Sequence, residues 1–371
     1  MTRLSSAAAP ALGMAAFFAT SPAFAHCFVG PRFFPSTLAV HDPCVNDELS
    51  FIGGSGLGAS HGHGGGGHGD GHEDGHGGGV GGDVAPPRDY GIVGEWQKRI
   101  TQDFAVSVES GWTRLHAIGG ASASGWNNFE TSFQYQFLTA PEAEFVAKAG
   151  LSVEWGATGN RSVGAERFTS LTPMIYFGKG FGDLPDSVGY LRPFAVTGQF
   201  GYSVPTWGRT VTSEVHHEVE EEVEDGETHV HEHTELHQSV ERHPYAFVWG
   251  AAVQYSLPYL KAQVIDLELP DFINRLTPLV EVKFAQPFTN TLTSGRQLVG
   301  TVNPGVIWTG QYFQLGAEAI IPINRASGKS VGWMLQLHFY LDDIFPTTIG
   351  RPIIQAVLPT TIGQPTSLSF E

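Results

Sequence analysis

The sequence predicts an all-β fold, a transmembrane antiparallel up-and-down β-barrel of about twelve strands. Segments of about ten residues alternate apolar and polar side chains and carry aromatic residues at their ends, as outer-membrane barrels do. The 371 residues include 47 Gly, 25 Phe and 8 Trp, but only 15% are charged, whereas about 25% is usual for a soluble protein. No apolar run of about 20 residues follows the N-terminus, so we expect no transmembrane helix.

Residues 1–25 have the pattern of a cleaved secretory signal peptide. Arg3 supplies the positive charge, a small apolar stretch follows, and Ala23-Phe24-Ala25 forms a cleavage site of the A-x-A type. We therefore expect an exported protein of the Gram-negative outer membrane. The net charge of −17 argues against nucleic acid as a partner. The expected partners are outer-membrane lipid and either metal ions or small solutes.

Residues 26–46 are expected to form an N-terminal periplasmic segment. It contains the only two cysteines, Cys27 and Cys44. In an exported chain the compartment is oxidising, so we expect these two residues to form a disulfide. The alternative is a cysteine-based metal site, but two thiolates alone do not complete a tetrahedral zinc site.

Residues 47–60 include a candidate for a short first strand, and residues 61–89 form a Gly- and His-rich loop. Glycine at this density predicts a flexible segment. Histidine-rich tracts bind borderline ions such as Zn²⁺, Ni²⁺ and Cu²⁺, although a plain spacer is the alternative. The candidate metal ligands in this loop are His61, His63, His68, His72 and His76.

Residues 90–341 contain the barrel. With the candidate first strand, the total becomes twelve, and single-chain barrels use even numbers. Short connections alternate with long ones, which predicts periplasmic turns at one end and extracellular loops at the other. The expected strands lie near 90–99, 103–115, 126–138, 144–156, 167–179, 190–203, 244–257, 277–287, 297–308, 311–321 and 330–341.

The polar faces of these strands are expected to line the barrel interior. Acidic side chains outnumber basic ones there, and rings of Asp or Glu favour cations. A water-filled pore and a lumen filled with side chains are both compatible with the pattern. The candidate lumen residues are Glu109, Glu130, Lys148, Glu154, Glu281, Lys283, Glu318 and His338.

Residues 204–243 form an acidic loop in which Asp225-Gly226 predicts a tight hairpin turn. Residues whose numbers sum to 451 then face each other, and five Glu–His pairs share one face. Five pairs in one register indicate selection, although a disordered acidic loop is the alternative and a three-residue turn would shift the register. The pairs are Glu214–His237, His216–Glu235, Glu218–His233, Glu220–His231 and Glu222–His229.

Two mechanisms fit such a hairpin. Neutral imidazoles and carboxylates capture a divalent metal near neutral pH and lose it on acidification, because protons compete for the ligands. Alternatively no metal is involved, and the histidines become charged near pH 6.5 and form ion pairs with the glutamates. No cofactor is required in either case, and Zn, Ni or Cu enters only in the first.

Residues 342–371 are expected to form a periplasmic tail, in which FPTTIG at 345–350 recurs as LPTTIG at 358–363. The stretches RFFPSTLAVHDPCVNDELS (32–50) and PINRASGKSVGWMLQLHFYLDDIFPTTIGRP (322–352) resemble stretches of uncharacterised proteobacterial outer-membrane proteins. More loosely, the barrel is similar to outer-membrane transporters grouped with a phenol-degradation pathway. The resemblance implies fold and location and transfers no catalytic residue.

The function predicted from the sequence is metal binding by an outer-membrane barrel through extracellular His/Glu-rich loops, with a cation-biased pore as an added hypothesis. The alternative is a general porin or small hydrophobic-solute transporter whose His-rich loops are incidental or respond to pH. The sequence shows no nucleophile-elbow, P-loop, dinucleotide, HExxH or CxxC pattern, so we expect no enzyme.

Overall fold

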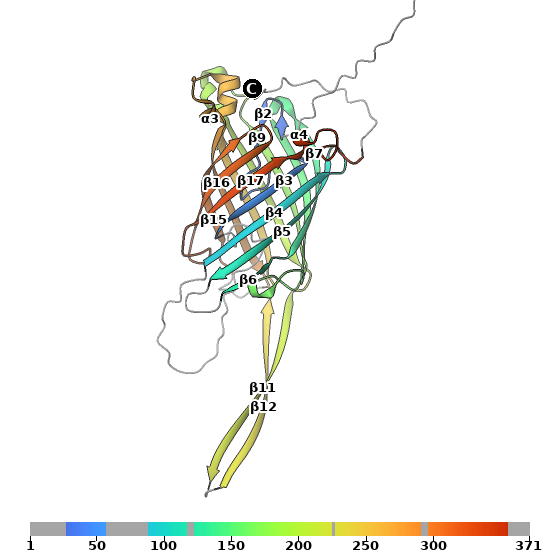
Figure 1. Cartoon of the computed structure of the whole chain (residues 1–371), viewed down its shortest axis with the longest axis vertical. Coiled ribbons are helices and arrows are strands. Elements are labelled where there is room, and N and C mark those ends of the chain that lie inside the picture. Colours follow the sequence, from blue (N-terminus) through green and yellow to red (C-terminus); the bar gives the residue numbers. More distant parts are fainter. Residues whose placement is uncertain (1–26, 57–87, 117–121, 225–226, 291–295, 355–371) are drawn as a thin grey trace, which may run out of the picture.

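The structure is a computed structural model that describes residues 27–56, 88–116, 122–224, 227–290 and 296–354, with side chains described for all of these except 88, 212–239 and 241. One β-sheet closes into a barrel, and a separate two-stranded ribbon projects from one end of it (Figure 1). No helix among the described residues is long and apolar enough to cross a membrane.

The barrel wall has twelve strand positions, as the sequence predicts. Each position is called a stave below. Its sheet contains thirteen strands, but β6 and β7 both pair with β5 and form one stave together. The first and last staves, β3 and β17, pair antiparallel from Ser55–Trp333 to Glu48–Tyr340, which closes the sheet. The barrel strands are β3 (Glu48–Ser55), β4 (Arg88–Arg99), β5 (Phe104–His116), β6 (Ala123–Trp126), β7 (Phe129–Ala140), β8 (Phe145–Trp155), β9 (Ser170–Gly180), β10 (Phe194–Pro205), β13 (Tyr245–Tyr255), β14 (Leu276–Thr289), β15 (Val299–Thr309), β16 (Phe313–Pro322) and β17 (Gly332–Tyr340).

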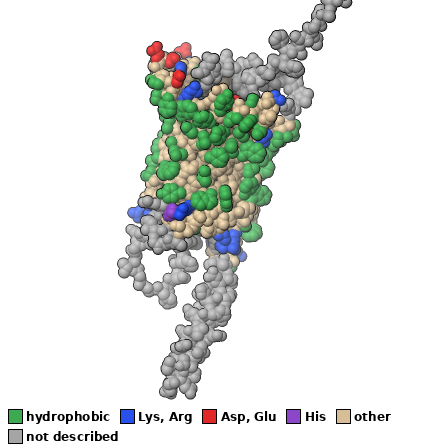
Figure 2. Space-filling view, viewed as in Figure 1, with side chains coloured by type: hydrophobic (Ala, Val, Ile, Leu, Met, Phe, Trp, Pro, Cys, Tyr) green, Lys and Arg blue, Asp and Glu red, His purple; other side chains and the backbone are tan. Residues whose placement is uncertain are grey.

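Strand β7 illustrates why these residues form a membrane barrel. Side chains alternate between the two faces of a strand, so Phe133 and Tyr135 point outward and are 42% and 54% exposed. Their neighbours Ser132 and Gln134 point inward and are buried. Figure 2 shows hydrophobic side chains spread over the outer wall. An apolar exterior around a polar interior is the pattern of a membrane-spanning barrel.

The two ends of the barrel differ in the length of their connections. At one end, called the ribbon end, β11 (Arg209–Glu224) and β12 (Glu227–Arg242) form the ribbon between β10 and β13 (Figure 1). The opposite end carries short turns, such as residues 100–103 between β4 and β5. Two connections at this end are longer. The one between β9 and β10 contains η3 (Asp186–Leu191), and the one between β13 and β14 contains α2 (Leu257–Tyr259), η4 (Leu260–Val264) and α3 (Asp271–Asn274). Apart from these two, short and long connections alternate as predicted.

The N-terminal segment Cys27–Asn46, called the plug, lies inside the barrel and enters it at the end opposite the ribbon, called the plug end (Figure 1). Its short strands β1 (Phe28–Val29) and β2 (Arg32–Phe33) form a hairpin. A disulfide joins Cys27 to Cys44, with 5.5 Å between their Cα atoms. The sequence predicts the disulfide, but it predicts a periplasmic segment here and gives no indication that this segment fills the lumen.

Apolar contacts fix the depth of the plug. Leu38 and Ala39 are buried inside the barrel, in a cluster with inward side chains of β14 to β17. The wall residues of this cluster are Leu279, Ile307, Ile320 and Met334. A second apolar cluster joins Val29 and Phe34 of the plug to Val146 and Ala195 of the wall, so the two clusters together define the position of the plug.

We predict that the cost of a charge on the outer wall depends on its depth. Leu151, near the middle of β8, is 39% exposed, and Leu138, near the plug end of β7, is 45% exposed. Leu151→Lys is expected to lower the free energy of unfolding by about 2–4 kcal/mol and Leu138→Lys by about 0–1 kcal/mol. Denaturant unfolding in lipid vesicles measures both values, and equal costs would contradict a membrane-embedded wall.

Candidate functional site: a plugged lumen

The candidate site is the barrel interior, where the wall meets the plug. All eight lumen residues predicted from the sequence lie at inward positions of their strands. Two of them, Lys148 and Glu281, form hydrogen bonds with the plug. The buried members are Glu130, Lys148, Glu281, Glu318 and His338, and the half-buried ones are Glu109, Glu154 and Lys283.

The carboxylate of Glu281 binds three consecutive backbone N–H groups of the plug. Leu38 and Ala39 donate to Oε2, and Val40 donates to Oε1, each at 2.9 Å. Glu281 is fully buried on β14. Hydrogen bonds to an ionised acceptor contribute about 1.5–3 kcal/mol each, against about 0.5–1.5 kcal/mol for neutral pairs. This carboxylate is therefore the strongest single attachment of the plug's inner turn.

Amide side chains of the wall bind further backbone groups of the plug. Gln199 accepts a hydrogen bond from the His41 N–H at 2.9 Å, and Gln136 accepts one from Val45 at 3.0 Å. Gln97 donates to the Asn46 carbonyl at 3.2 Å. In a paired strand, backbone groups of the neighbouring strand bind the N–H and carbonyl groups. In the plug, side chains of the wall bind them instead. The contacts are polar and individually modest, and water can replace each of them.

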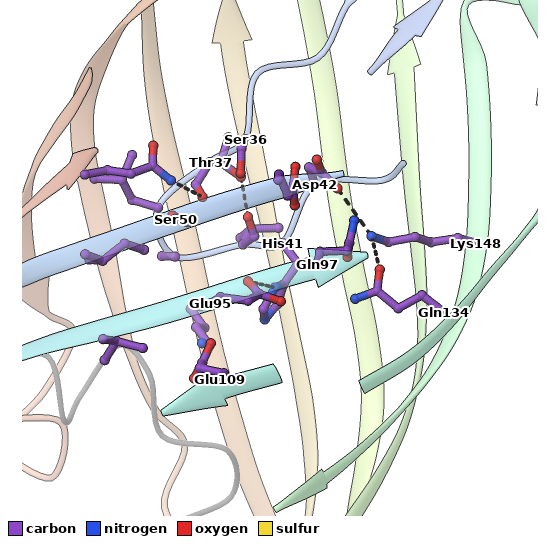
Figure 3. A pocket seen from close by; sticks show the side chains of 18 residues that line it. Ser36, Thr37, His41, Asp42, Ser50, Glu95, Gln97, Glu109, Gln134 and Lys148 are labelled. Carbon is purple, nitrogen blue, oxygen red and sulfur yellow. Dashed lines mark hydrogen bonds and ion pairs between the residues drawn. The ribbon is translucent and has the colours of Figure 1, made fainter. Parts of the chain in front are cut away.

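Lys148 on β8 is the buried cation of this interface. Its Nζ donates to the Cys44 carbonyl at 2.7 Å and lies 3.3 Å from Oδ1 of Asp42, also in the plug. It also donates to Gln134 Oε1 on the neighbouring stave and lies over the Tyr176 ring, 5.0 Å from its centroid. Figure 3 shows Asp42 and Gln134 reaching this ammonium group from opposite sides.

Arg32 anchors the base of the plug at the barrel rim. Its Nε donates to Glu144 Oε2 at 2.9 Å, both side chains are buried, and its guanidinium lies 3.7 Å from the Tyr259 ring centroid. Burial lowers the pKa of Arg32 and the ion pair with Glu144 opposes that shift, and arginine keeps its charge in proteins. Tyr259 donates to Glu144 at 2.8 Å, and burial raises the pKa of this phenol.

A glycine makes room for this anchor. A Cβ on Gly182 would lie 2.1 Å from Glu144 Oε1 and 2.2 Å from the Tyr259 hydroxyl. Its backbone N–H donates to Glu144 at 3.0 Å. Only glycine allows the β9–β10 turn to approach the carboxylate this closely, so the turn contributes a donor where a side chain would clash.

A second ionic cluster fixes the residue that follows the plug. Asp47 is fully buried and binds Arg99 through its Oδ2 at 2.8 Å and Lys98 through its Oδ1 at 2.6 Å. Arg99 also lies 2.7 Å from Asp342 in α4 (Leu341–Ile344). Burial raises the pKa of Asp342 to about 8, although Arg99 lowers it in part. The plug is thus anchored on both sides of its disulfide.

The described part of the C-terminal tail adds to this cluster. Gly350 and Arg351 offer carbonyl oxygens to Arg99 at 3.1 Å and to Lys98 at 2.7 Å. The Ile354 N–H donates to the Ile100 carbonyl at 2.7 Å. The first FPTTIG copy therefore packs at the plug end, while the second copy, 358–363, lies outside the described residues.

Little space remains between plug and wall. The cavity there has a volume of about 40 Å³, enough for a few water molecules. Its polar lining includes Thr37 and His41 of the plug and Glu95 and Glu109 of the wall (Figure 3). His41 Nδ1 lies 4.0 Å from Glu95 Oε2. At this contact the plug and the wall thus leave room only for a few water molecules.

Four glutamates lie in one row across neighbouring staves β4, β5, β7 and β8. The strand registers pair Glu95 with Glu109, Glu109 with Glu130, and Glu130 with Glu154. Directly opposed like charges destabilise a sheet, so such a row needs a reason other than stability. Three members were predicted as lumen residues, and Glu95 was not, although it shares the inward face of β4 with Val93 and Gln97.

The ribbon has the predicted register. Its backbone pairs Glu222 with His229 and Glu214 with His237, and the three intermediate Glu–His pairs are also present. The side chains of these residues, and the tract from His61 to His76, lie outside the described part of the structure. Among the residues whose side chains are described, no group of three or more His, Cys, Asp and Glu is placed to bind a metal ion.

Apart from Lys148 and Glu281, the sequence did not predict the residues that join the plug to the wall. Arg32, Glu144 and Gln199 belong to segments far apart in the chain. One signal was present, because glutamine recurs at inward positions of the wall. Those positions are Gln97, Gln134, Gln136, Gln199, Gln254, Gln314 and Gln336.

Several solved structures of outer-membrane barrels are similar to this chain. No family model and no curated protein matches the sequence, so the resemblance to phenol-degradation transporters is not confirmed. The KdgM porin is similar with a TM-score of 0.39 and 8% identity over 79% of this chain and 98% of that one. The COG4313 outer membrane channel from Pseudomonas putida F1 gives 0.43 and 9% over 83% and 99%. The NanC porin gives 0.38 and 8% over 78% and 97%.

We predict that the Arg32–Glu144 pair contributes far more to stability than an exposed pair at the same end. Removing one partner leaves a buried charge without its counterion, which costs about 3–5 kcal/mol. Arg32→Met is expected to show this loss in vesicle unfolding. Lys179→Met, which removes the Lys179–Asp183 pair with a half-exposed aspartate, should cost about 0–1 kcal/mol. Equal losses of unfolding free energy in the two variants would contradict the role of Arg32 as the anchor.

Proposed function

We propose that this protein is an outer-membrane channel for small polar solutes, cations above all, that is closed at rest by its own N-terminal plug. The ribbon end faces outward and the plug end faces the periplasm, because long loops are extracellular in such barrels and short turns periplasmic. The proposal is of a transport protein rather than an enzyme. A polar wall fits hydrated solutes better than the hydrophobic solutes considered above.

The observation that carries the proposal is the way the plug is bound. Glu281, Gln199 and the other wall side chains satisfy its peptide groups, so no strand pairing has to break for the inner turn to leave. Water can satisfy the same wall groups afterwards. Several wall groups already lack a hydrogen-bond partner among the described residues, and buried groups of this kind are ordinarily satisfied by water. They are Thr197, Gln254, Thr277 and Thr301.

The charge of the wall supports the preference for cations. Acidic groups line it on most staves, and the row from Glu95 to Glu154 concentrates four of them in one band. Lys148 and Lys283 are the basic groups among the predicted lumen residues, with His338 beside Glu48 at 3.4 Å. Rings of carboxylates select cations in channels, so a hydrated lumen of this composition attracts cations and repels anions.

We predict that Glu281→Gln opens the channel. The neutral amide offers one acceptor oxygen, whereas the carboxylate offers two charged ones. The free energy of plug binding is therefore expected to weaken by roughly 1–3 kcal/mol in total. In planar-bilayer recordings, openings are expected roughly tenfold or more as often as in the wild type, with K⁺ passing in preference to Cl⁻. Folding is checked by thermal unfolding in the same lipid.

The matched control is Glu154→Gln, which removes a wall carboxylate that contacts Asn128 rather than the plug. Its opening frequency should equal that of the wild type. A wild-type barrel that conducts continuously, or a Glu281→Gln barrel that stays as closed as the wild type, would contradict closure by the plug.

The ribbon supports a second candidate function, the binding of divalent transition metal at the cell surface. Its backbone register places five glutamates opposite five histidines, from Glu214–His237 to Glu222–His229. Opposed Cβ atoms lie roughly 5 Å apart, which suits two ligands of one ion, and imidazole suits Zn²⁺, Ni²⁺ and Cu²⁺. The Gly-spaced histidines from His61 to His76 belong to the same proposal, because β3 ends and β4 begins at the ribbon end.

We predict that His229, His231 and His233 all replaced by Ala weakens Zn²⁺ binding at least tenfold, because three of the five pairs lose their imidazole. Calorimetry at pH 7.5 and 5.5 measures it, and binding should weaken at the lower pH because protons compete for the ligands. The control is His116→Ala, a histidine on β5. Unchanged Zn²⁺ binding in the triple variant would contradict metal binding by the ribbon. The remaining hypothesis would then be ion pairing of its histidines and glutamates at low pH.

A further inference from the structure

A surface groove lies at the ribbon end, over the connection between β16 and β17. It has a volume of about 570 Å³ and is separate from the lumen. Its lining combines apolar, polar and basic side chains. The lining residues used below are Ile321, Asn324, Arg325, Lys329 and Val331.

The turn that forms this groove has a defined shape. The Asn324 side chain accepts hydrogen bonds from the Ser327 N–H and hydroxyl, both at 2.9 Å, and donates to the Leu298 carbonyl at 2.7 Å. Ser327 in turn accepts from the Gly300 N–H at 2.9 Å. Gly328 has φ +141°, a conformation that favours glycine. The turn is thus fixed to the start of β15 and presents Arg325 and Lys329 four residues apart.

Arg325 and Lys329 are exposed and carry two positive charges into the groove. Within the described residues, neither side chain forms an ion pair. Figure 2 shows basic side chains at both ends of the face in view, and acidic ones at the plug end alone. The charge of the groove is therefore complementary to an anionic ligand.

The apolar side of the groove continues the lipid-facing wall. Val331 is 65% exposed and precedes Trp333 and Leu335 on the outward face of β17. Ile321 is 40% exposed at the end of the outward face of β16. A ligand in the groove thus has its polar end beside Arg325 and Lys329 and its apolar end along a membrane-facing surface.

We propose that this groove binds an anionic, phosphate-bearing membrane lipid of the leaflet at the ribbon end. Its phosphate lies between Arg325 and Lys329, and its acyl chain lies along Ile321, Val331 and Trp333. Basic pockets beside apolar transmembrane surfaces recognise anionic headgroups in this way. The proposal requires a barrel in a membrane and is independent of whether the lumen conducts.

The test is native mass spectrometry of the full-length protein in detergent, titrated with phosphatidylglycerol or with zwitterionic phosphatidylcholine. The wild type is expected to retain phosphatidylglycerol preferentially. Arg325→Ala/Lys329→Ala is expected to bind it roughly 30-fold more weakly, because each basic residue near a membrane surface contributes to anionic lipid binding. The control Lys261→Ala/Arg351→Ala removes two basic residues from the plug end and should bind like the wild type.

Two further measurements separate a lipid site from a plain anion site. Val331→Ser keeps both charges and should also weaken phosphatidylglycerol retention, because the acyl chain loses an apolar contact. Inorganic phosphate should compete only weakly. Equal retention by the Arg325→Ala/Lys329→Ala variant, or full competition by inorganic phosphate with no effect of Val331→Ser, would overturn the proposal. Thermal unfolding verifies that each variant is folded.

Discussion

The structure depends on one constraint, that a polypeptide backbone cannot leave its peptide groups unpaired in a membrane interior. The wall meets it by closure, because β17 pairs with β3 along eight residues and leaves no open edge. The plug meets it differently. Its inner turn has no strand to pair with, so inward side chains supply the partners, foremost the Glu281 carboxylate with its three donors. The same requirement is thus met by backbone pairing in the wall and by side-chain hydrogen bonds at the plug.

The attachments of the plug differ between its base and its inner turn. At the base, the Arg32–Glu144 pair and the Asp47–Arg99 pair are buried ionic contacts, and the Cys27–Cys44 disulfide ties the two sides together. Between them, the inner turn is bound by hydrogen bonds and by the small apolar cluster around Leu38. Breaking a buried ion pair costs far more than exchanging a neutral hydrogen bond for water. In the opening proposed above, the inner turn therefore leaves first and the base stays in place.

The sequence predicted the wall because its information is local. Alternation with period 2 fixes which face each side chain takes, and the sequence Asp225-Gly226 predicts the register in which β11 pairs with β12. A single strand was predicted near 126–138, whereas the structure divides it at Asn127 and Asn128, whose side chains bind Thr113 and Glu154. Contacts of this kind do not produce a periodic pattern in the sequence, so alternation cannot predict them.

The plug was invisible in the sequence for the same reason. Residues 26–46 have neither strand alternation nor a charge pattern that marks the inside of a barrel. Arg32 meets Glu144 across 112 positions, and Leu38 meets Glu281 across 243. Composition identified Glu281 and Lys148 as lumen residues, but it could not show that a segment of the same chain would be their partner. Local alternation in the wall strands predicts which side chains face the interior. Which segment fills the interior depends on its three-dimensional fit to the wall.

The pairing of plug and wall also explains how so acidic a lumen stays closed. The plug supplies three N–H donors to Glu281, and it supplies Asp42 and the Cys44 carbonyl to Lys148. It therefore satisfies one wall anion and one wall cation at once. His41 of the plug approaches the row from Glu95 to Glu154, with its Nδ1 4.0 Å from Glu95 Oε2. In the opening proposed above, the inner turn leaves and the net charge of the wall hardly changes. The main difference between the two proposed states is then the hydration of these groups, and the acidic row is present in both.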